Sequence, residues 1–301
     1  MSWRSLVISR PSRISIKNNQ LVIEQEEAVS MPVEDITSII IESPQVVITV
    51  KALDLLSSNG TIVYICNDKH TPSSYFLPFY QHSRQYGIIK QQLSITEPFK
   101  KRVWQQIIKQ KICNQAYVLL CLGKRDEAER IQSFANQVDS GDTKNIEGQV
   151  AKMYFEYAFG KGFNRNYENT YNACLDYGYS ILRGAIARII AKYGFIPSVG
   201  IHHKSELNNY NLADDFIEPF RPIVDMWVTQ NIHNKDVDFT KDIRAQIVDL
   251  LNYDVIIDGK RQCVTNAINI MISYFSTAVQ NKDYEKIKLP ILVPLERHEY
   301  E

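Results

Sequence analysis

The chain has few cysteines, and no two of them lie close together in the sequence. Its 301 residues include five, none of which forms a Cys-x-x-Cys pair: Cys66, Cys113, Cys121, Cys174 and Cys263. This spacing favours neither a disulfide framework nor a structural zinc site, so we expect reduced thiols. The start of the chain has no sustained apolar segment, and no run of about eighteen apolar residues occurs anywhere. The sequence therefore predicts a soluble, cytoplasmic protein that does not enter a membrane.

The sequence also lacks the motifs of nucleotide-dependent and nucleophile-dependent enzymes. Neither the G-x-x-x-x-G-K-[ST] loop nor the G-x-G-x-x-G fingerprint is present, so we expect no nucleotide cofactor. No Ser-His-Asp or Cys-His pattern points to a nucleophilic side chain. These absences agree with chemistry in which the protein itself supplies no nucleophile.

Charge of neither sign is in excess, but the basic residues are unevenly spread. Thirty-four Lys and Arg balance thirty-four Asp and Glu. Between residues 84 and 111, a single acid, Glu97, stands among seven bases: Arg84, Lys90, Lys100, Lys101, Arg102, Lys109 and Lys111. Because binding responds to local charge more than to the net charge of the chain, the neutral total does not exclude a nucleic-acid partner.

Two hydrophobic patterns divide the chain. The first 75 residues read as short β-branched strands, with a hairpin turn at Asn18-Asn19 and one short helix ending at Asn59-Gly60. Later apolar residues recur three and four positions apart, which is typical of helices. We therefore predict an α+β protein made of a β domain at 1–75, a linker at 76–95, an all-α domain at 96–285 and an extended tail at 286–301. The apolar tail suits docking on the edge strand of a partner's β-sheet.

The stretch "GIHHKSELNNYNLADDFIEPFR" is a candidate metal site. On a helix, Asp215 and Glu218 project from one face, and their oxygens with an imidazole suit Mg²⁺ or Mn²⁺. Zinc would prefer more nitrogen or sulfur ligands. Pro219 allows a different arrangement, in which the helix begins there and the aspartates lie in the preceding loop.

The residues of this stretch also fit a purely structural interpretation. Two histidines in a polar loop are commonly just solvated, and acids at a helix start complement the helix dipole. The stretch by itself does not choose between His202 and His203 as a ligand.

Two further segments each have two interpretations. Glu147 heads a helix in "EGQVAKMYF", where it either complements the dipole or offers a third carboxylate. The helix in "WQQIIKQKICNQA" either exposes Lys109 and Lys111 to water or contacts phosphates through them, with Asn114 and Gln115 as hydrogen-bond donors.

The order of these motifs resembles one known family. A β-rich start is followed by "WQQIIKQKICNQA", "EGQVAKMYF", "NACLDYGYSILRG", "GIHH" and "LADDFIEPFRPIVD". This series is similar to the CRISPR-associated integrase that carries out spacer acquisition, and most like the short members from type II systems. The resemblance covers almost the whole chain and implies the family's fold, a β domain followed by a helical catalytic domain.

The resemblance also implies a ligand set. The family's G-x-x-H motif places the ligand histidine at His203 and leaves His202 as its neighbour. Glu147 matches the family's glutamate at a helix start, and D-x-x-E-x-F-R gives Asp215 and Glu218. We therefore expect catalytic Glu147, His203 and Glu218 to bind Mg²⁺ or Mn²⁺ directly. Asp215 would either assist through water or hold His203.

By the same resemblance, the protein would insert short DNA fragments into a CRISPR array. It would join 3′-hydroxyl ends to the repeat by in-line phosphoryl transfer, working as a homodimer through its β domain, with a small ferredoxin-like subunit. The residues expected to contact double-stranded DNA are Lys100, Lys101, Arg102, Lys109, Lys111, Asn114, Lys204 and Arg221. Two other functions remain as alternatives, a non-catalytic DNA-binding scaffold and a metal-dependent phosphoesterase.

Overall fold

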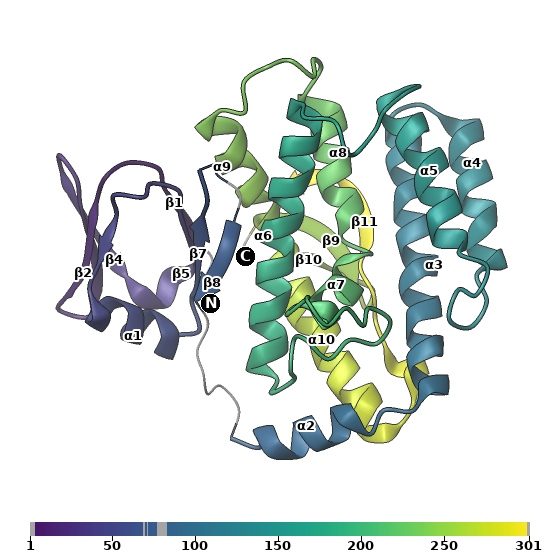
Figure 1. Cartoon of the computed structure of the whole chain (residues 1–301), viewed down its shortest axis with the longest axis horizontal. Helices are drawn as coiled ribbons and strands as arrows, with labels where there is room; N and C mark the ends of the chain where they lie inside the picture. The colour runs from purple at the N-terminus through teal and green to yellow at the C-terminus, as the bar shows by residue number, and fades with distance from the viewer. Residues whose placement is uncertain (1–3, 69, 71, 77–82, 300–301) are drawn as a thin grey trace.

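The computed structural model describes residues 4–68, 70, 72–76 and 83–299. Within them, a β-rich start is followed by a mostly helical remainder, which confirms the predicted α+β class (Figure 1). The start forms two four-stranded sheets, ordered β1-β5-β7-β8 and β4-β3-β2-β6. Its elements are β1 (Arg4–Ile8), β2 (Arg13–Lys17), β3 (Gln20–Glu24), β4 (Ala28–Pro32), β5 (Ile36–Ile41), β6 (Val47–Ile48), α1 (Val50–Ser58), β7 (Ile62–Cys66) and β8 (Pro72–Phe76).

The turn between β2 and β3 follows from its two asparagines. Asn18 and Asn19 have φ angles of 51° and 59°, and Lys17 pairs with Gln20 across the antiparallel strands. Positive φ at both central residues matches the twist of a two-residue hairpin, and asparagine tolerates it. The predicted hairpin is confirmed.

The sheet β1-β5-β7-β8 separates two hydrophobic cores. Ile39 and Val63 face a core shared with the second sheet, whereas Ile40 and Tyr64 belong to the core of the helical part. This alternation is the two-residue period of a strand. The Tyr64 ring lies so close to helix α6 that a Cβ at Gly184 would be 2.3 Å from its Cε1. A glycine there lets the sheet dock directly on the helix.

The helical part is built around α6, which contacts α7, α8, α9 and α10 (Figure 1). A second group, α3, α4 and α5, packs together and joins the first where α3 meets α8. The helices are α2 (Gln85–Leu93), α3 (Glu97–Cys121), α4 (Arg125–Phe134), α5 (Ile146–Phe159), α6 (Thr170–Lys192), α7 (Asn211–Ile217), α8 (Arg221–Asn231), α9 (Lys241–Asp249) and α10 (Val264–Asn281).

The expected linker is partly structured. Helix α2 lies within residues 76–95, while 77–82 fall outside the described residues, as do the chain ends of the predicted β domain and tail. In the described part of the chain, no helix is both long and apolar enough to cross a membrane.

A small sheet near the C-terminus corrects the prediction of an all-α second domain. Strands β9 (Tyr253–Ile257), β10 (Lys260–Cys263) and β11 (Ile291–Arg297) pair in the order β10-β9-β11. The turn between β9 and β10 is Asp258-Gly259, with φ angles of 50° and 73°. Asp-Gly flanked by strand residues is a strong hairpin signal. The tail is extended as predicted, but it pairs with β9 of its own chain.

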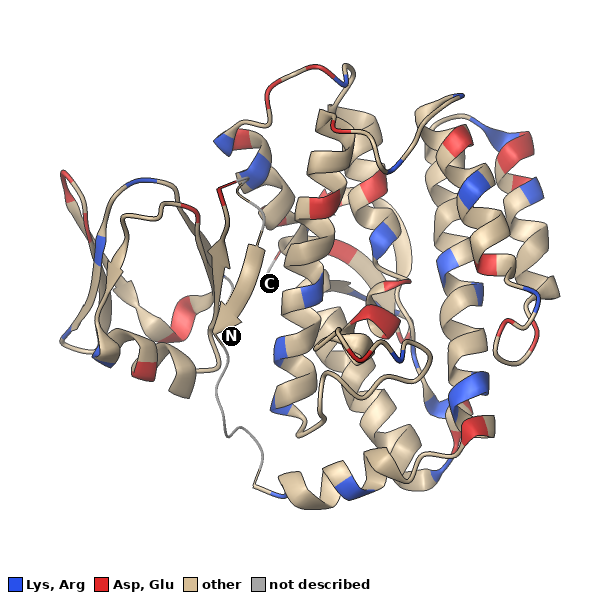
Figure 2. Cartoon of the chain, in the orientation of Figure 1, with Lys and Arg blue, Asp and Glu red and all other residues tan. Residues whose placement is uncertain are grey.

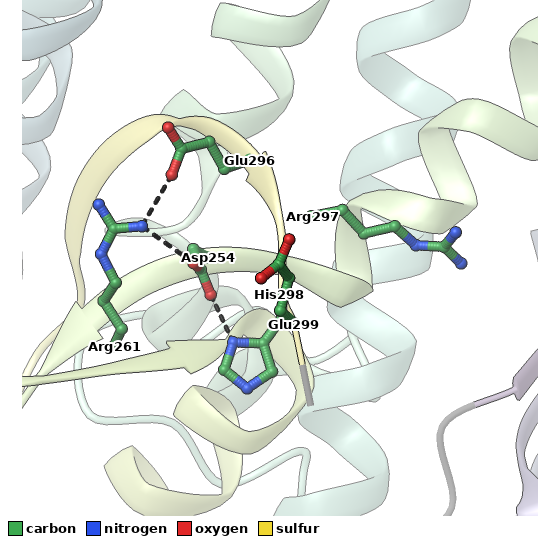
Figure 3. A pocket seen from close by; sticks show the side chains of 6 residues that line it. All are labelled: Asp254, Arg261, Glu296, Arg297, His298 and Glu299. Atoms are coloured by element: carbon green, nitrogen blue, oxygen red, sulfur yellow. Dashed lines mark hydrogen bonds and ion pairs between the residues drawn. The ribbon is translucent and has the colours of Figure 1, made fainter. Parts of the chain in front are cut away.

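This sheet carries a polar pocket (Figure 3). The Asp254 carboxylate lies 2.6 Å from His298 Nδ1 and accepts a hydrogen bond of 3.2 Å from Arg261. Arg261 also donates to Glu296 at 2.8 Å. These contacts tie the last strand to β9 and β10. It is lined by Asp254, Arg261, Glu296, Arg297, His298 and Glu299.

Candidate active site

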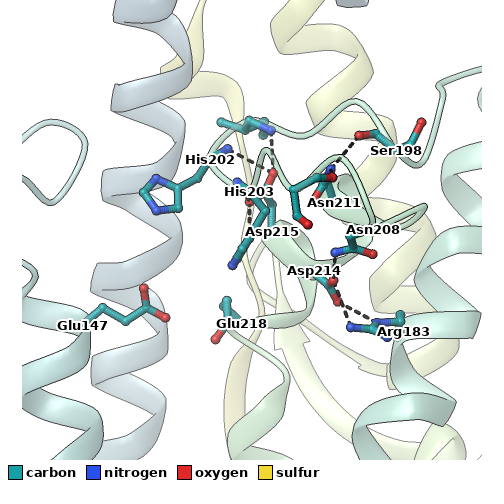
Figure 4. A network of polar contacts seen from close by, with 12 residues as sticks. Glu147, Arg183, Ser198, His202, His203, Asn208, Asn211, Asp214, Asp215 and Glu218 are labelled. Carbon is teal, nitrogen blue, oxygen red and sulfur yellow. Dashed lines mark hydrogen bonds and ion pairs between the residues drawn. The ribbon is translucent and has the colours of Figure 1, made fainter.

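Three separate segments bring the predicted ligands together. Figure 4 shows Glu147, His203 and Glu218 pointing toward one another from α5, from the loop before α7 and from the end of α7. Glu147 is fixed by the cap of α5, because the carboxylate of Asp142 accepts from its backbone N–H at 3.0 Å and from that of Ile146 at 2.9 Å. A carboxylate in this position satisfies two of the amides that a helix start leaves open.

The acids of the second motif lie on a helix. Asp215 is inside α7, and Glu218 caps its C-terminal end with helical φ and ψ angles of −52° and −46°. Helix α8 begins only at Arg221, so the alternative of a helix starting at Pro219 is wrong. Asp214 faces elsewhere, because Arg183 binds its two carboxylate oxygens at 2.6 and 2.9 Å.

The buried carboxylate of Asp215 organises the G-x-x-H loop. It accepts from the backbone N–H groups of Ile201, His202 and His203, at 2.5, 3.2 and 3.0 Å. It also lies 2.8 Å from His203 Nδ1, which leaves Nε2 as the free ligand atom. At Gly200, a Cβ would lie 2.3 Å from the His203 carbonyl oxygen and 2.9 Å from the Asp215 carboxylate, so only glycine fits.

These contacts connect Asp215 to His203, while the role of Asp215 in metal binding stays a prediction. The hydrogen bond to Asp215 raises the pKa of His203, although partial burial opposes it. A carboxylate behind a ligand histidine fixes the ring's tautomer and orientation.

The two histidines differ in their surroundings. The His202 ring stacks flat on Trp104 of α3, with centroids 4.1 Å apart, while His203 meets the same indole edge-on at 5.6 Å. Partial burial lowers the pKa of His202. Trp104 therefore packs against both rings, a contact that sequence reasoning missed because nothing in the sequence places α3 beside this loop.

A buried lysine lies at the centre of the site. Lys111 Nζ is 2.6 Å from Glu147 Oε1 and 2.5 Å from Glu218 Oε2, and its side chain is 9% exposed. Burial lowers the pKa of Lys111, but attraction to Glu218 and Glu147 outweighs it, and the net shift is upward. Arg221 adds a second cation, with Nε 2.9 Å from Glu218 Oε1. The interpretation of Lys111 as solvated is wrong.

The donor set nevertheless suits a hard divalent cation. Two carboxylates and one imidazole nitrogen match Mg²⁺ or Mn²⁺. In the part of the chain that the structure describes, no three His, Cys, Asp or Glu side chains are close enough to enclose an ion. The ammonium of Lys111 lies between Glu147 and Glu218, where it would compete with a metal for their oxygens.

Comparison with known proteins identifies the family. The family model described as "CRISPR associated protein Cas1" matches residues 6–254. The chain belongs to the Cas1 family. It is 40% identical to the CRISPR-associated endonuclease Cas1 of Neisseria meningitidis serogroup C, across all of both chains. A second Cas1 endonuclease, from Saccharolobus solfataricus, is 27% identical over 78% of this chain and 77% of its own.

Solved structures share the Cas1 fold. A casposase bound to integration product has a TM-score of 0.75 at 19% identity, covering 94% of this chain and 93% of its own. A Cas1 protein from Thermotoga maritima has a TM-score of 0.74 at 17% identity, covering 92% and 97%. At these identities the likeness shows a common fold. The family inferred from the order of the sequence motifs is confirmed.

The residues expected to contact DNA fall into two groups in this Cas1 chain. Lys101 and Arg102 are exposed at the N-terminal end of α3, where Figure 2 shows basic residues gathered. Lys100 and Lys204 lie beside them, with Nζ atoms 3.2 and 3.4 Å from Glu97. These four cations form the basic end of α3, while Lys109 is half-buried farther along the helix.

Asn114 and Lys111 do not fit the role of DNA contacts here. Asn114 is 1% exposed, and its amide donates to the carbonyl oxygens of Pro219 at 2.7 Å and Pro290 at 3.0 Å. Its side chain joins α3 to the segment after Glu218. Lys111 faces the carboxylates instead of solvent. Arg221 also binds Glu218, but its side chain is 26% exposed, against 9% for Lys111.

A second buried acid lies behind the site. Asp225 of α8 accepts hydrogen bonds from Tyr154, at 3.0 Å, and from Tyr179. Burial raises the pKa of Asp225 to about 6, although these two hydrogen bonds lower it. Sequence reasoning missed this residue because nothing in "RPIVDMWV" distinguishes it from a solvated helix acid.

We expect Asp225 to make the protein more stable in mild acid. A carboxyl group whose pKa is raised by folding binds its proton more tightly when folded, so it adds stability as the pH falls through 6. The free energy of unfolding of the wild type, relative to Asp225→Asn, should rise by about 1 kcal/mol from pH 8 to pH 5. Urea unfolding of both proteins at the two pH values measures this, and a flat or falling difference would contradict it.

Proposed function

We propose that this chain is a metal-dependent DNA integrase and endonuclease that inserts short DNA fragments into a CRISPR array. The proposal rests above all on one observation. His203, oriented by the buried Asp215 carboxylate, points its free Nε2 toward the carboxylates of Glu147 and Glu218 (Figure 4). The names of its relatives add support, since one is a CRISPR-associated endonuclease and another is a casposase bound to integration product.

The residues of the site have distinct roles in this reaction. Glu147, Glu218 and His203 would hold Mg²⁺ or Mn²⁺, which when bound polarises the phosphodiester and stabilises the attacking and leaving oxygens. The attacking hydroxyl comes from the 3′ end of the incoming DNA, so no side chain forms a covalent bond. Asp215 keeps the His203 ring in place, and Arg221, fixed against Glu218, presents the rest of its guanidinium to the phosphate.

Binding of the DNA backbone falls to the basic end of α3. Lys101, Arg102 and Lys204 are exposed there, and contacts of this kind give affinity that falls steeply with salt. The full assembly would include a second copy joined through the β-rich start and a small ferredoxin-like subunit. A chain of a solved Cas6-RT-Cas1–Cas2 complex shares the fold, with a TM-score of 0.73 over 97% of this chain, and that complex includes Cas2.

We expect joining of DNA ends to require a divalent metal. The purified protein with its small partner would receive a labelled duplex with free 3′-hydroxyls and a plasmid that carries the repeat. Joined product should form with Mn²⁺ or Mg²⁺ and fall to background in EDTA, because the carboxylates and imidazole alone cannot stabilise the developing charge.

The same assay separates this proposal from its alternatives. DNA binding without joining under every metal would leave a non-catalytic scaffold. Hydrolysis of a small phosphodiester that is insensitive to salt, without joining of DNA, would indicate a phosphoesterase.

A further inference from the structure

The positive charge at the centre of the site is the ammonium group of Lys111. Lys111 Nζ contacts Glu147 Oε1 and Glu218 Oε2, the oxygens of two proposed metal ligands that come from different helices. The lysine side chain is 9% exposed, and that of Glu218 is 5% exposed. Two carboxylates this close would repel each other strongly in such a dry environment without a cation between them.

The ammonium and a divalent ion would compete for these oxygens. Mg²⁺ binds carboxylate oxygens at about 2.0–2.1 Å, and the ammonium already lies against one oxygen of each glutamate. Arg221 does not replace it, because it contacts Glu218 alone among the two glutamates, through the other oxygen. A metal that sits between the two glutamates, where the ammonium now lies, would therefore displace the lysine.

We propose that Lys111 is a built-in competitor of the catalytic metal, which holds the metal-free site together and weakens metal binding. This inference rests on the proposed metal site. The lysine keeps Glu147 and Glu218 in position when no metal is present. The lysine also sets a minimum affinity for the metal, since only a cation that binds the two carboxylates more favourably than the ammonium can replace it.

The test measures binding of Mn²⁺ alone, without DNA. Lys111→Met keeps most of the side-chain length and removes the charge, and Lys111→Gln is a second variant that keeps a hydrogen-bond donor. Both should bind Mn²⁺ at least about tenfold more tightly than the wild type, because a full positive charge is removed a few ångströms from the ion. The loss of the free Mn²⁺ signal in electron paramagnetic resonance gives the affinity directly.

Thermal unfolding provides a second readout. Without metal, Lys111→Met should melt below the wild type, because two carboxylates lose their shared partner. Added Mn²⁺ should raise its melting temperature more than that of the wild type. Lys109→Met is the matched control, because it removes the same charge from the same helix at a position two residues away, and it should resemble the wild type in both measurements.

The outcomes separate the two proposals. Suppose that the wild type binds Mn²⁺ through Glu147, but neither Lys111 variant binds it more tightly. This result overturns the competitor role of Lys111 and supports the metal site. Absence of Glu147-dependent binding in the wild type and both Lys111 variants overturns the metal site and the competitor role together. Equal tightening in Lys109→Met would attribute the effect to net charge and would also reject the competitor role.

Discussion

His203→Ala is expected to reduce strand transfer by more than about a hundredfold, since loss of even an outer-shell partner of a metal ligand costs 10–100-fold. His203 Nε2, which the contact of Nδ1 with Asp215 leaves free, is the imidazole nitrogen that points toward Glu147 and Glu218 (Figure 4). Removing it leaves a carboxylate pair with two neighbouring cations. The initial rate of joining, with Mn²⁺ in excess, measures the loss.

His202→Ala is the matched control for this experiment. The His202 ring stacks on Trp104, but its contact with Asp215 comes from the backbone N–H, which alanine retains. We therefore expect a far smaller loss, mainly from weaker packing against the indole. A larger loss in His202→Ala than in His203→Ala would show that the wrong histidine has been assigned as the ligand.

Arg244→Met should lower the free energy of unfolding by about 3–5 kcal/mol, which is the usual cost of leaving one buried charge unpaired. Arg244 of α9 binds both oxygens of Glu42, at 2.7 and 2.9 Å, and the glutamate side chain is fully buried. Glu42 directly follows β5, so this pair joins the β-rich start to the helical part. Tyr177 also donates to Glu42 at 3.2 Å and would remain its only described partner.

Two controls make this prediction specific. Arg125→Ala removes an exposed ion pair with Glu129, which is 68% exposed, and should cost less than about 1 kcal/mol. Adding Glu42→Gln to Arg244→Met should recover much of the lost stability, because the orphaned charge is removed as well. Urea unfolding of the four proteins measures these differences. If Arg244→Met is as mild as the surface variant, the buried pair does not hold the two parts together.

Elements set by local chemistry were predictable from the sequence. The hairpin at Asn18-Asn19 needs only residues that tolerate positive φ, and α3 and α10 follow from apolar spacing that the core then uses. The Asp258-Gly259 hairpin was missed although it carries an equally local signal, because the surrounding helical pattern outweighed it. The partner of the tail was not predictable, since an extended apolar segment fits any open strand edge.

The site was predictable in composition but not in its internal contacts. The resemblance to a family singled out Glu147, His203 and Glu218, and the structure points them at one another. Nothing in the sequence shows that Lys111 lies between two of them, while the other three lysines of the same helix are exposed or half-buried. Pairing between residues 36 to 107 positions apart depends on how helices cross, which local patterns do not encode.

The side chain of Asn114 is bound by residues that are synthesised much later, so these contacts form only near the end of translation. It binds the Pro290 carbonyl, and it accepts from the Leu292 backbone N–H across 178 residues of chain. At the usual pace of translation, roughly 10–40 s pass between the two ends of that contact. During this time helix α3, which carries Lys111, lacks the contacts of Asn114 with Pro290 and Leu292. A nascent chain that stops short of residue 292 holds every proposed ligand but lacks β11 and its hydrogen bond to Asn114.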